Sequence, residues 1–152
     1  MKLVTTRLAA FAIASTIFAS HVACGGPTLV VQQYDGPLRP QDTISILRVN
    51  GGGSVQLLTL DDTDVAVPIA KDTRLHLELL PGRHTVDVVN VTTPNAPPAT
   101  VAFDAAPGRV YRVAFVASES SSGPTAHVYE VERGGDALLR EVTVDPRVRT
   151  PR

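Results

Sequence analysis

Few side chains in this 152-residue sequence could carry out chemistry, and they are far apart. Cys24 is the only cysteine, and a thiol can act as a nucleophile or as a metal ligand. His76, Glu78 and Asp87 form a second candidate group, because imidazole and carboxylate groups bind divalent cations. No Gly-x-Ser-x-Gly motif is present, and no His and Asp framework accompanies the serines. The sequence therefore predicts no enzyme, no catalytic residue and no cofactor.

A secretory signal is predicted for residues 1–23. Lys2 and Arg7 precede eleven mostly apolar residues, Leu8–Phe18, and small residues then lead to Ala23. A basic, then an apolar, then a small-residue part is the order of cleavable export signals. A retained membrane helix fits less well, because Leu8–Ala23 is only sixteen residues long and is interrupted by polar side chains, whereas about 20 apolar residues are needed to cross a bilayer.

A cysteine directly after such a signal resembles the lipobox of bacterial lipoproteins, in which the thiol is diacylated and the new N-terminus is acylated. The two residues before the cysteine fit that motif, whereas His21 stands where the family usually has leucine. The resemblance implies lipidation of Cys24 and a lipid-anchored protein of the bacterial cell envelope. Gly25 is compatible with sorting to the outer membrane, with the body on its periplasmic or surface face. Ordinary signal-peptidase cleavage, after Ala19 or after Gly25, is the alternative.

The composition limits the partners of the remaining chain. Without the basic residues of the signal, Lys2 and Arg7, twelve Lys and Arg stand against fifteen Asp and Glu, a net charge of −3. A net negative domain is a poor partner for nucleic acid. A single cysteine cannot form an internal disulfide, so the fold must rest on its hydrophobic core. Residues 146–152 hold three arginines and two prolines, and we expect a disordered basic tail there.

Residues 24–41 are rich in glycine and proline, which favour turns and extended chain, so they predict a lipidated cysteine followed by a tether. A flexible coil of that length spans roughly 20 to 25 Å on average. Thr28–Tyr34 is rich in β-forming residues and could instead pair as an edge strand. The segment Tyr34-Asp35-Gly36-Pro37, followed by Arg39-Pro40, resembles a stretch found just after the acylated cysteine of uncharacterised bacterial lipoproteins, and it implies no activity.

Residues 42–145 predict an all-β domain, an antiparallel β-sandwich with at most one short helix. Three pairs of apolar, alternating segments surround turns that contain glycine, and each pair predicts a hairpin. These pairs are 43–49 with 55–60, 74–80 with 83–89, and 101–105 with 110–115. The prolines of 94–98 predict an exposed crossing loop between the second and third hairpins.

Shorter segments complete the domain. The acidic residues of 61–64 predict a solvated turn, since they lack the spacing of a calcium loop. A short strand is expected at 65–69 and another at 126–132. The pattern of 137–144 fits either a last strand or one short helix that begins at Asp136.

The second hairpin places the candidate metal ligands. With Leu80 opposite Arg83, His76 lies directly across from Asp87 on the outer face, and Glu78 lies nearby on that face. Three such groups on a flat hairpin do not close a tetrahedral site, so they remain weak candidates and we expect no metal. His84 falls on the apolar face, where a partly buried ring bonded to the backbone is expected.

The turn segments Leu80-Pro81-Gly82-Arg83-His84-Thr85-Val86 and Ala106-Pro107-Gly108-Arg109-Val110-Tyr111 resemble those of PEGA-type, immunoglobulin-like modules in bacterial envelope proteins. This resemblance implies an interaction or structural module without a chemical step. The sequence thus predicts a non-enzymatic envelope protein held in the membrane by lipid on Cys24, with another envelope protein as its partner. The alternative is a soluble periplasmic protein that binds a ligand or metal through His76, Glu78 and Asp87.

Overall fold

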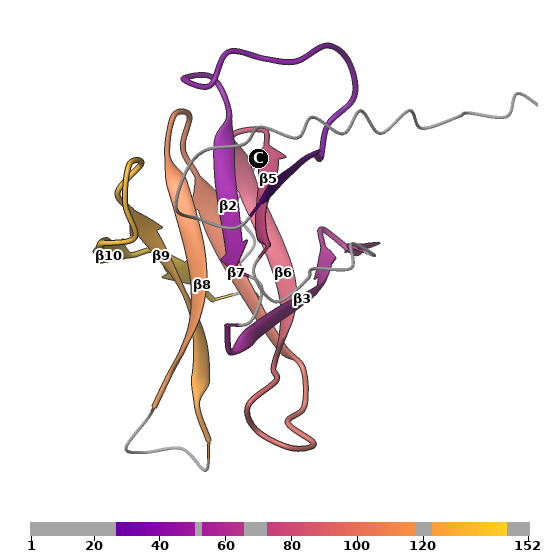
Figure 1. The fold of residues 1–152 in the computed structure, drawn as a ribbon, viewed down its shortest axis with the longest axis vertical. Coiled ribbons are helices and arrows are strands. Elements are labelled where there is room, and N and C mark those ends of the chain that lie inside the picture. The colour runs from indigo at the N-terminus through magenta and orange to yellow at the C-terminus, as the bar shows by residue number, and fades with distance from the viewer. Residues whose placement is uncertain (1–26, 51–52, 66–72, 118–122, 146–152) are drawn as a thin grey trace, which may run out of the picture.

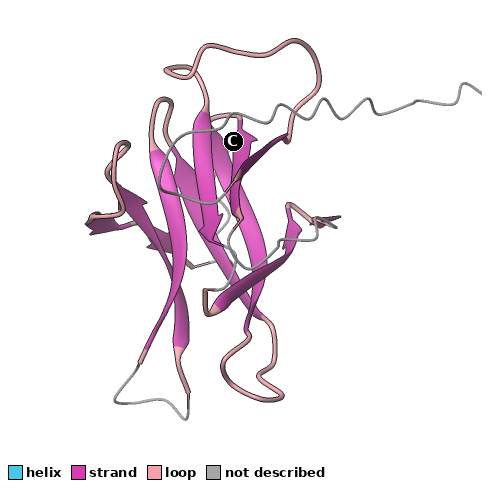
Figure 2. Ribbon diagram, in the orientation of Figure 1, coloured by secondary structure: helices cyan, strands magenta, loops and turns pink. Residues whose placement is uncertain are grey.

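The computed structural model describes residues 27–50, 53–65, 73–117 and 123–145. Regular structure within these segments consists of strands only, as Figure 2 shows. No helix that could cross a membrane is found in the part of the chain described. The all-β class predicted from the sequence is therefore confirmed. Some predictions lie outside the described residues. They include the lipidation of Cys24, most of the strand at 65–69, and the tail at 146–152.

Eleven strands are described, and their bounds are as follows. They are β1 (Thr28–Gln32), β2 (Ser45–Asn50), β3 (Val55–Leu60), β4 (Thr63–Asp64), β5 (Arg74–Leu79), β6 (Gly82–Asn90), β7 (Ala99–Ala105), β8 (Val110–Val116), β9 (Thr125–Val131), β10 (Leu138–Glu141) and β11 (Thr143–Val144).

The strands form two sheets that pack face to face (Figure 1). Sheet A has the order β1-β5-β2-β8-β9-β10, and sheet B has the order β11-β7-β6-β3-β4. Sheet A is mixed, because β1 runs parallel to β5 and β2 runs parallel to β8. The expectation of a purely antiparallel sandwich is therefore wrong for sheet A. Parallel neighbours arise because the chain passes through the other sheet before it returns.

The three turns predicted as hairpins connect the two sheets instead. β2 and β3, β5 and β6, and β7 and β8 are consecutive in sequence but belong to opposite sheets. The predicted ladder with His76 across from Asp87 is wrong, because His76 pairs within sheet A and Asp87 within sheet B. Two strands that stack face to face across a core have the same apolar alternation as two strands paired in a hairpin.

The inward faces are those that the alternation predicted. Leu75, Leu77 and Leu79 of β5 face the core from sheet A, and Val86 and Val88 of β6 face it from sheet B; all five are at most 1% exposed. At roughly 25 cal/mol per Å² of apolar surface, each buried Leu or Val side chain contributes on the order of 2 kcal/mol. The described residues include no cysteine and therefore no disulfide. Their stability thus depends on the core between the sheets.

The loops also differ in part from expectation. Residues 94–98 are mostly exposed, as predicted, but they join β6 and β7, which are neighbours in sheet B. Asp61 and Asp62 adopt positive φ values of 50° and 62° in the turn between β3 and β4, where the sequence predicted a turn. The edge-strand alternative for Thr28–Tyr34 is the one present, since β1 pairs with β5. Residues 28–32 are therefore part of the body and not of a tether.

The C-terminal segment passes from one sheet to the other. β10 pairs with β9 in sheet A, and β11 pairs with β7 in sheet B. Between them, the amide of Val142 donates to the carbonyl oxygen of Val128 at 2.8 Å. The strand alternative for 137–144 is thus correct, and these residues connect the two sheets along one side of the sandwich.

Candidate functional site

The three candidate metal ligands do not meet. His76 and Glu78 lie on the outer face of β5, whereas Asp87 lies on β6 in the other sheet. Glu78 accepts a hydrogen bond from the Tyr34 hydroxyl at 3.2 Å. No group of three His, Cys, Asp or Glu side chains close enough to hold a metal ion is found among the described residues. The fold thus places His76 and Glu78 in one sheet and Asp87 in the other, so the three side chains do not form one site.

Asp87 has a structural role on the outer face of sheet B. Its carboxylate accepts hydrogen bonds from the hydroxyls of Thr100 at 2.6 Å and Thr59 at 2.7 Å. These two bonds, that of Thr100 first, lower the pKa of Asp87. Because the threonines come from the strands on either side, Asp87 links β3, β6 and β7.

His84 is a partly buried ring bonded to the backbone, as predicted, and its second nitrogen contacts a carboxylate that the sequence did not predict. One nitrogen lies 2.7 Å from the carbonyl oxygen of Leu80, and the other lies 2.6 Å from the carboxylate of Asp61. The same carboxylate accepts the amide hydrogen of Thr85 at 2.8 Å. Burial alone lowers the pKa of His84, but the bonds to Asp61 and Leu80 together raise it above its ordinary value. This pair fixes the start of β6 to the turn after β3.

A polar hollow of about 230 Å³ lies on the outer face of sheet A. Its side chains come from Arg48 on β2, from Arg74 and His76 on β5, and from Asp136 in the turn before β10. The ladder explains this grouping, since Arg48 is the register partner of His76. Backbone of Gly134 and Gly135 closes the hollow on the side away from β5.

Arg48 fastens the turn between β9 and β10 to the sheet. Its guanidinium donates to the carbonyl oxygens of Gly135 at 2.7 Å, of Glu132 at 3.4 Å and of Arg133. Asp136 lies 3.9 Å from the same guanidinium. Three backbone acceptors around one side chain that is 15% exposed give Arg48 a structural role.

The surroundings of His76, beside Arg48, disfavour the protonated form of its imidazole. Burial, followed by the positive charges of Arg48 and Arg74, lowers the pKa of His76 to about 4. The imidazole is therefore neutral at pH 7. The net charge of the hollow then comes from its two arginines and Asp136.

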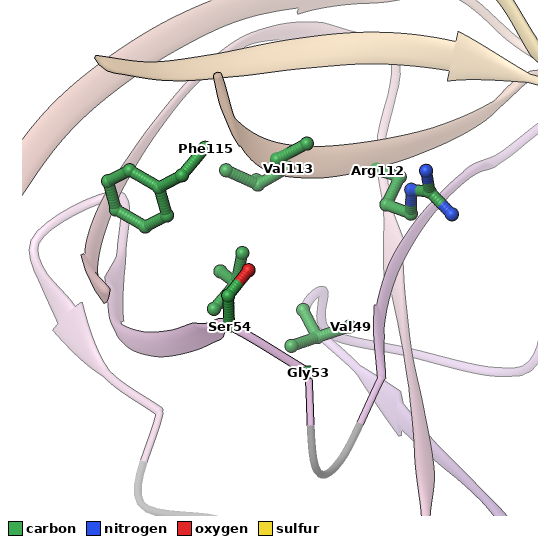
Figure 3. A pocket seen from close by; sticks show the side chains of 8 residues that line it. Val49, Gly53, Ser54, Arg112, Val113 and Phe115 are labelled. Carbon is green, nitrogen blue, oxygen red and sulfur yellow. The ribbon is translucent and has the colours of Figure 1, made fainter. Parts of the chain in front are cut away.

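A second hollow, of about 190 Å³, lies between the end of β2, the start of β3 and the strand β8. Figure 3 shows Phe115 at one end, Arg112 at the other, and Val49 and Ser54 facing Val113 between them. None of the residues that line it carries a carboxylate, an imidazole or a thiol. It therefore offers apolar surface and no general acid or base.

The two edges of sheet A differ. β1 is one edge, and its residues are all half-buried. β10 is the other edge, and all four of its residues are exposed, with Leu138 at 48% and Leu139 at 58%. Edge strands carry backbone groups that another chain can pair with. β10 therefore combines an open ladder edge with exposed apolar side chains.

Sequence reasoning misjudged two charged side chains. It gave no role to Arg48, and it counted Glu130 among the exposed carboxylates of strands, which is wrong: Glu130 is 4% exposed and pairs with Arg109 at 3.2 Å and with Arg140 at 2.8 Å. Glu130 follows the inward Val128 by two residues, so the alternation of β9 was the available signal. Arg48 gave no comparable signal, because its acceptors are more than 80 residues away in the chain.

No family model matches the chain, and no curated protein or solved structure is similar enough to it to count as a match. The fold and the sites above are therefore described from this chain alone.

Proposed function

We propose that this protein is a non-enzymatic, lipid-anchored component of the bacterial cell envelope, whose body acts as a structural or protein-interaction module. The signal at residues 1–23 and the cysteine that follows it support the anchor. The observation that carries the proposal is the strand order of sheet A. β1, next to Cys24 in sequence, is one edge, and β10 is the other.

The anchor would hold the body close to the bilayer. β1 begins at Thr28, so only Gly25–Pro27 separate the sheet from Cys24. Four residue steps extend at most about 14 Å, far less than a tether through residue 41 would allow. The β1 edge is then the part of sheet A next to the lipid. Strand addition at β1 would have to occur against the membrane.

β10 is the edge that remains accessible for a partner. Five strand spacings separate β10 from β1, which is about 24 Å. We expect an extended segment of another envelope protein to pair with β10 and to cover Leu138 and Leu139. Neither side chain is part of the core cluster, and each is about half exposed. A partner could therefore cover both side chains without a change in the packing of the described sandwich.

The anchor is tested by the intact mass of protein extracted from membranes. A mature chain that begins at Cys24 and carries the mass of acyl chains is expected, and it should resist a carbonate wash. A free thiol at Cys24, or a chain that begins at another residue, contradicts the anchor.

The partner edge is tested by a photo-crosslinking residue placed at Leu139 in cells. Val91, which is 53% exposed in the loop after β6, serves as the matched control position. We expect one envelope protein to be captured from position 139 and not from position 91. The change Leu139→Lys should abolish an interaction measured with that purified protein, because a charged edge opposes strand addition. Equal capture from both positions, or unchanged binding by the lysine variant, counts against β10.

A further inference from the structure

The outer face of sheet A carries three arginines on neighbouring strands, of which Arg48 and Arg74 line the polar hollow and the third lines the second hollow. Arg74, Arg48 and Arg112 come from three consecutive strands of the order β5-β2-β8. Arg48 and Arg112 are direct register partners, and Arg48 is opposite His76. Like charges at neighbouring positions of a sheet repel one another, so an anion that binds among these arginines would be stabilised.

Two of these arginines have no counterion in the part of the chain that the structure describes. Asp136 lies 3.9 Å from Arg48, and no described carboxylate forms an ion pair with Arg74 or Arg112. Arg48 is already bonded to three carbonyl oxygens. Within the lining of the hollow, Arg74 therefore keeps guanidinium donors for a ligand, and Nε of Arg48 is buried without a partner among the described residues.

The chain itself brings lipid to this face. Thr28, the first residue of β1, is the register partner of Arg74. Cys24 is four residues earlier, a reach of at most about 14 Å. One further strand spacing, about 5 Å, leads from β1 to β5, where Arg74 stands. A lipid in the leaflet that holds the anchor thus lies within about 20 Å of the hollow.

We propose that the hollow formed by Arg48, Arg74 and His76 receives the phosphate of a phospholipid headgroup from the bilayer in which Cys24 is anchored. This inference rests on the proposed lipid anchor. Arginine matches phosphate oxygens with two parallel N–H donors, and such charge-assisted bonds are the stronger kind. A neutral imidazole at His76 adds one more N–H donor. Among the described residues that line the hollow, Asp136 is the one with a carboxylate, and it is paired with Arg48.

Binding at the hollow has a readout that is independent of membranes. An anion next to His76 stabilises its protonated form, so occupancy raises the pKa of His76 from about 4. We suggest full-chain protein, purified from membranes in detergent, with its imidazole signals followed by NMR as glycerol phosphate is added. The change Arg74→Gln removes the free guanidinium group that lines the hollow and leaves Arg48 in place.

The expected result is a rise in the pKa of His76 with glycerol phosphate, and binding about tenfold or more weaker in the Arg74→Gln variant. Arg39→Gln, in the loop after β1, is the matched control and should bind as the unchanged protein does. An unchanged backbone spectrum of each variant verifies its fold. No effect of glycerol phosphate on His76, or equal binding by the Arg74→Gln variant, overturns the site.

Vesicles distinguish a lipid headgroup from free phosphate. In vesicles that contain phosphatidylglycerol, the His76 signals should shift as they do with glycerol phosphate. In vesicles of an uncharged galactosyl diacylglycerol they should not. A site that binds glycerol phosphate but ignores phosphatidylglycerol overturns the lipid assignment. An unlipidated Cys24, seen by intact mass, overturns the proposed function, whereas the glycerol phosphate titration is independent of that result.

Discussion

The rings of Phe103 on β7 and Tyr111 on β8 lie 5.1 Å apart between their centroids, across the interior of the sandwich. Both are fully buried, and they belong to opposite sheets. The Tyr111 hydroxyl accepts the amide hydrogen of Ala106 at 2.8 Å. One aromatic pair therefore joins the two sheets, and its hydroxyl fixes the turn that connects them.

This relationship predicts unequal losses of stability. Phe103→Ala should lower the free energy of unfolding by about 3 to 5 kcal/mol, because it leaves a cavity between the sheets. Tyr111→Phe keeps the ring and removes only the acceptor for Ala106, so a loss of about 1 to 2 kcal/mol is expected. Urea unfolding measures both, and a larger loss for Tyr111→Phe than for Phe103→Ala would contradict this arrangement.

Gly108 predicts a second difference, within the same turn. Its φ of +73° is unfavourable for a residue with a side chain, and an added Cβ would lie 3.4 Å from the carbonyl oxygen of Asp42. Gly108→Ala should therefore cost about 1 to 2 kcal/mol in unfolding free energy. Gly134→Ala is the control, since an added Cβ there meets no atom within 4 Å. Thermal unfolding of the two variants side by side decides the matter, and equal midpoints would refute the role of Gly108.

How far the sequence predicts this fold depends on the range of each interaction. The alternation within residues 74–80 is enough to place Leu75, Leu77 and Leu79 on one apolar face, because a strand places every second side chain on the same side. It does not predict their neighbours in the sheet, since β5 pairs with β1 and β2 and not with β6. Alternation fixes which way a side chain points, and it leaves the partner strand open.

The same limit applies to the hollow. Arg48 stands between the inward Leu47 and Val49, which predicts an outward side chain and nothing more. Arg74 and His76 are placed beside it only by the long-range pairing of β2 with β5. A site built across strands from distant parts of the sequence therefore appears only when the strand order is known.

Arg48 predicts a local effect on the turn between β9 and β10. Arg48→Lys keeps the positive charge, but a single ammonium cannot reach all three carbonyl oxygens that the planar guanidinium contacts. A loss of about 1 to 2 kcal/mol in unfolding free energy is expected, together with faster amide hydrogen exchange in residues 132–137. Arg112→Lys, its neighbour on β8, should leave this exchange unchanged. Equal exchange in both variants would exclude the fastening role of Arg48.

The pair of His84 and Asp61 predicts how stability depends on pH. The pKa of Asp61 is lowered: burial acts against this, and the hydrogen bonds from His84 and Thr85 outweigh it. Its contribution is present above the unfolded pKa, about 3.9, and is lost as the pH falls through the folded pKa. His84 has a raised pKa, so its contribution is complete below about pH 6.5 and is lost as the pH rises through the folded value.

Both contributions are therefore present together between about pH 4 and pH 6.5. The difference in unfolding free energy between the unchanged protein and Asp61→Asn should be largest in that window, as measured by urea unfolding from pH 3 to 9. His84→Asn should lower this pH-dependent part as well, and the loss in the double variant should be smaller than the sum of the two single losses, because both changes break the same contact between Asp61 and His84. Additive losses in the double variant would show that the two side chains act independently, contrary to the 2.6 Å contact between them.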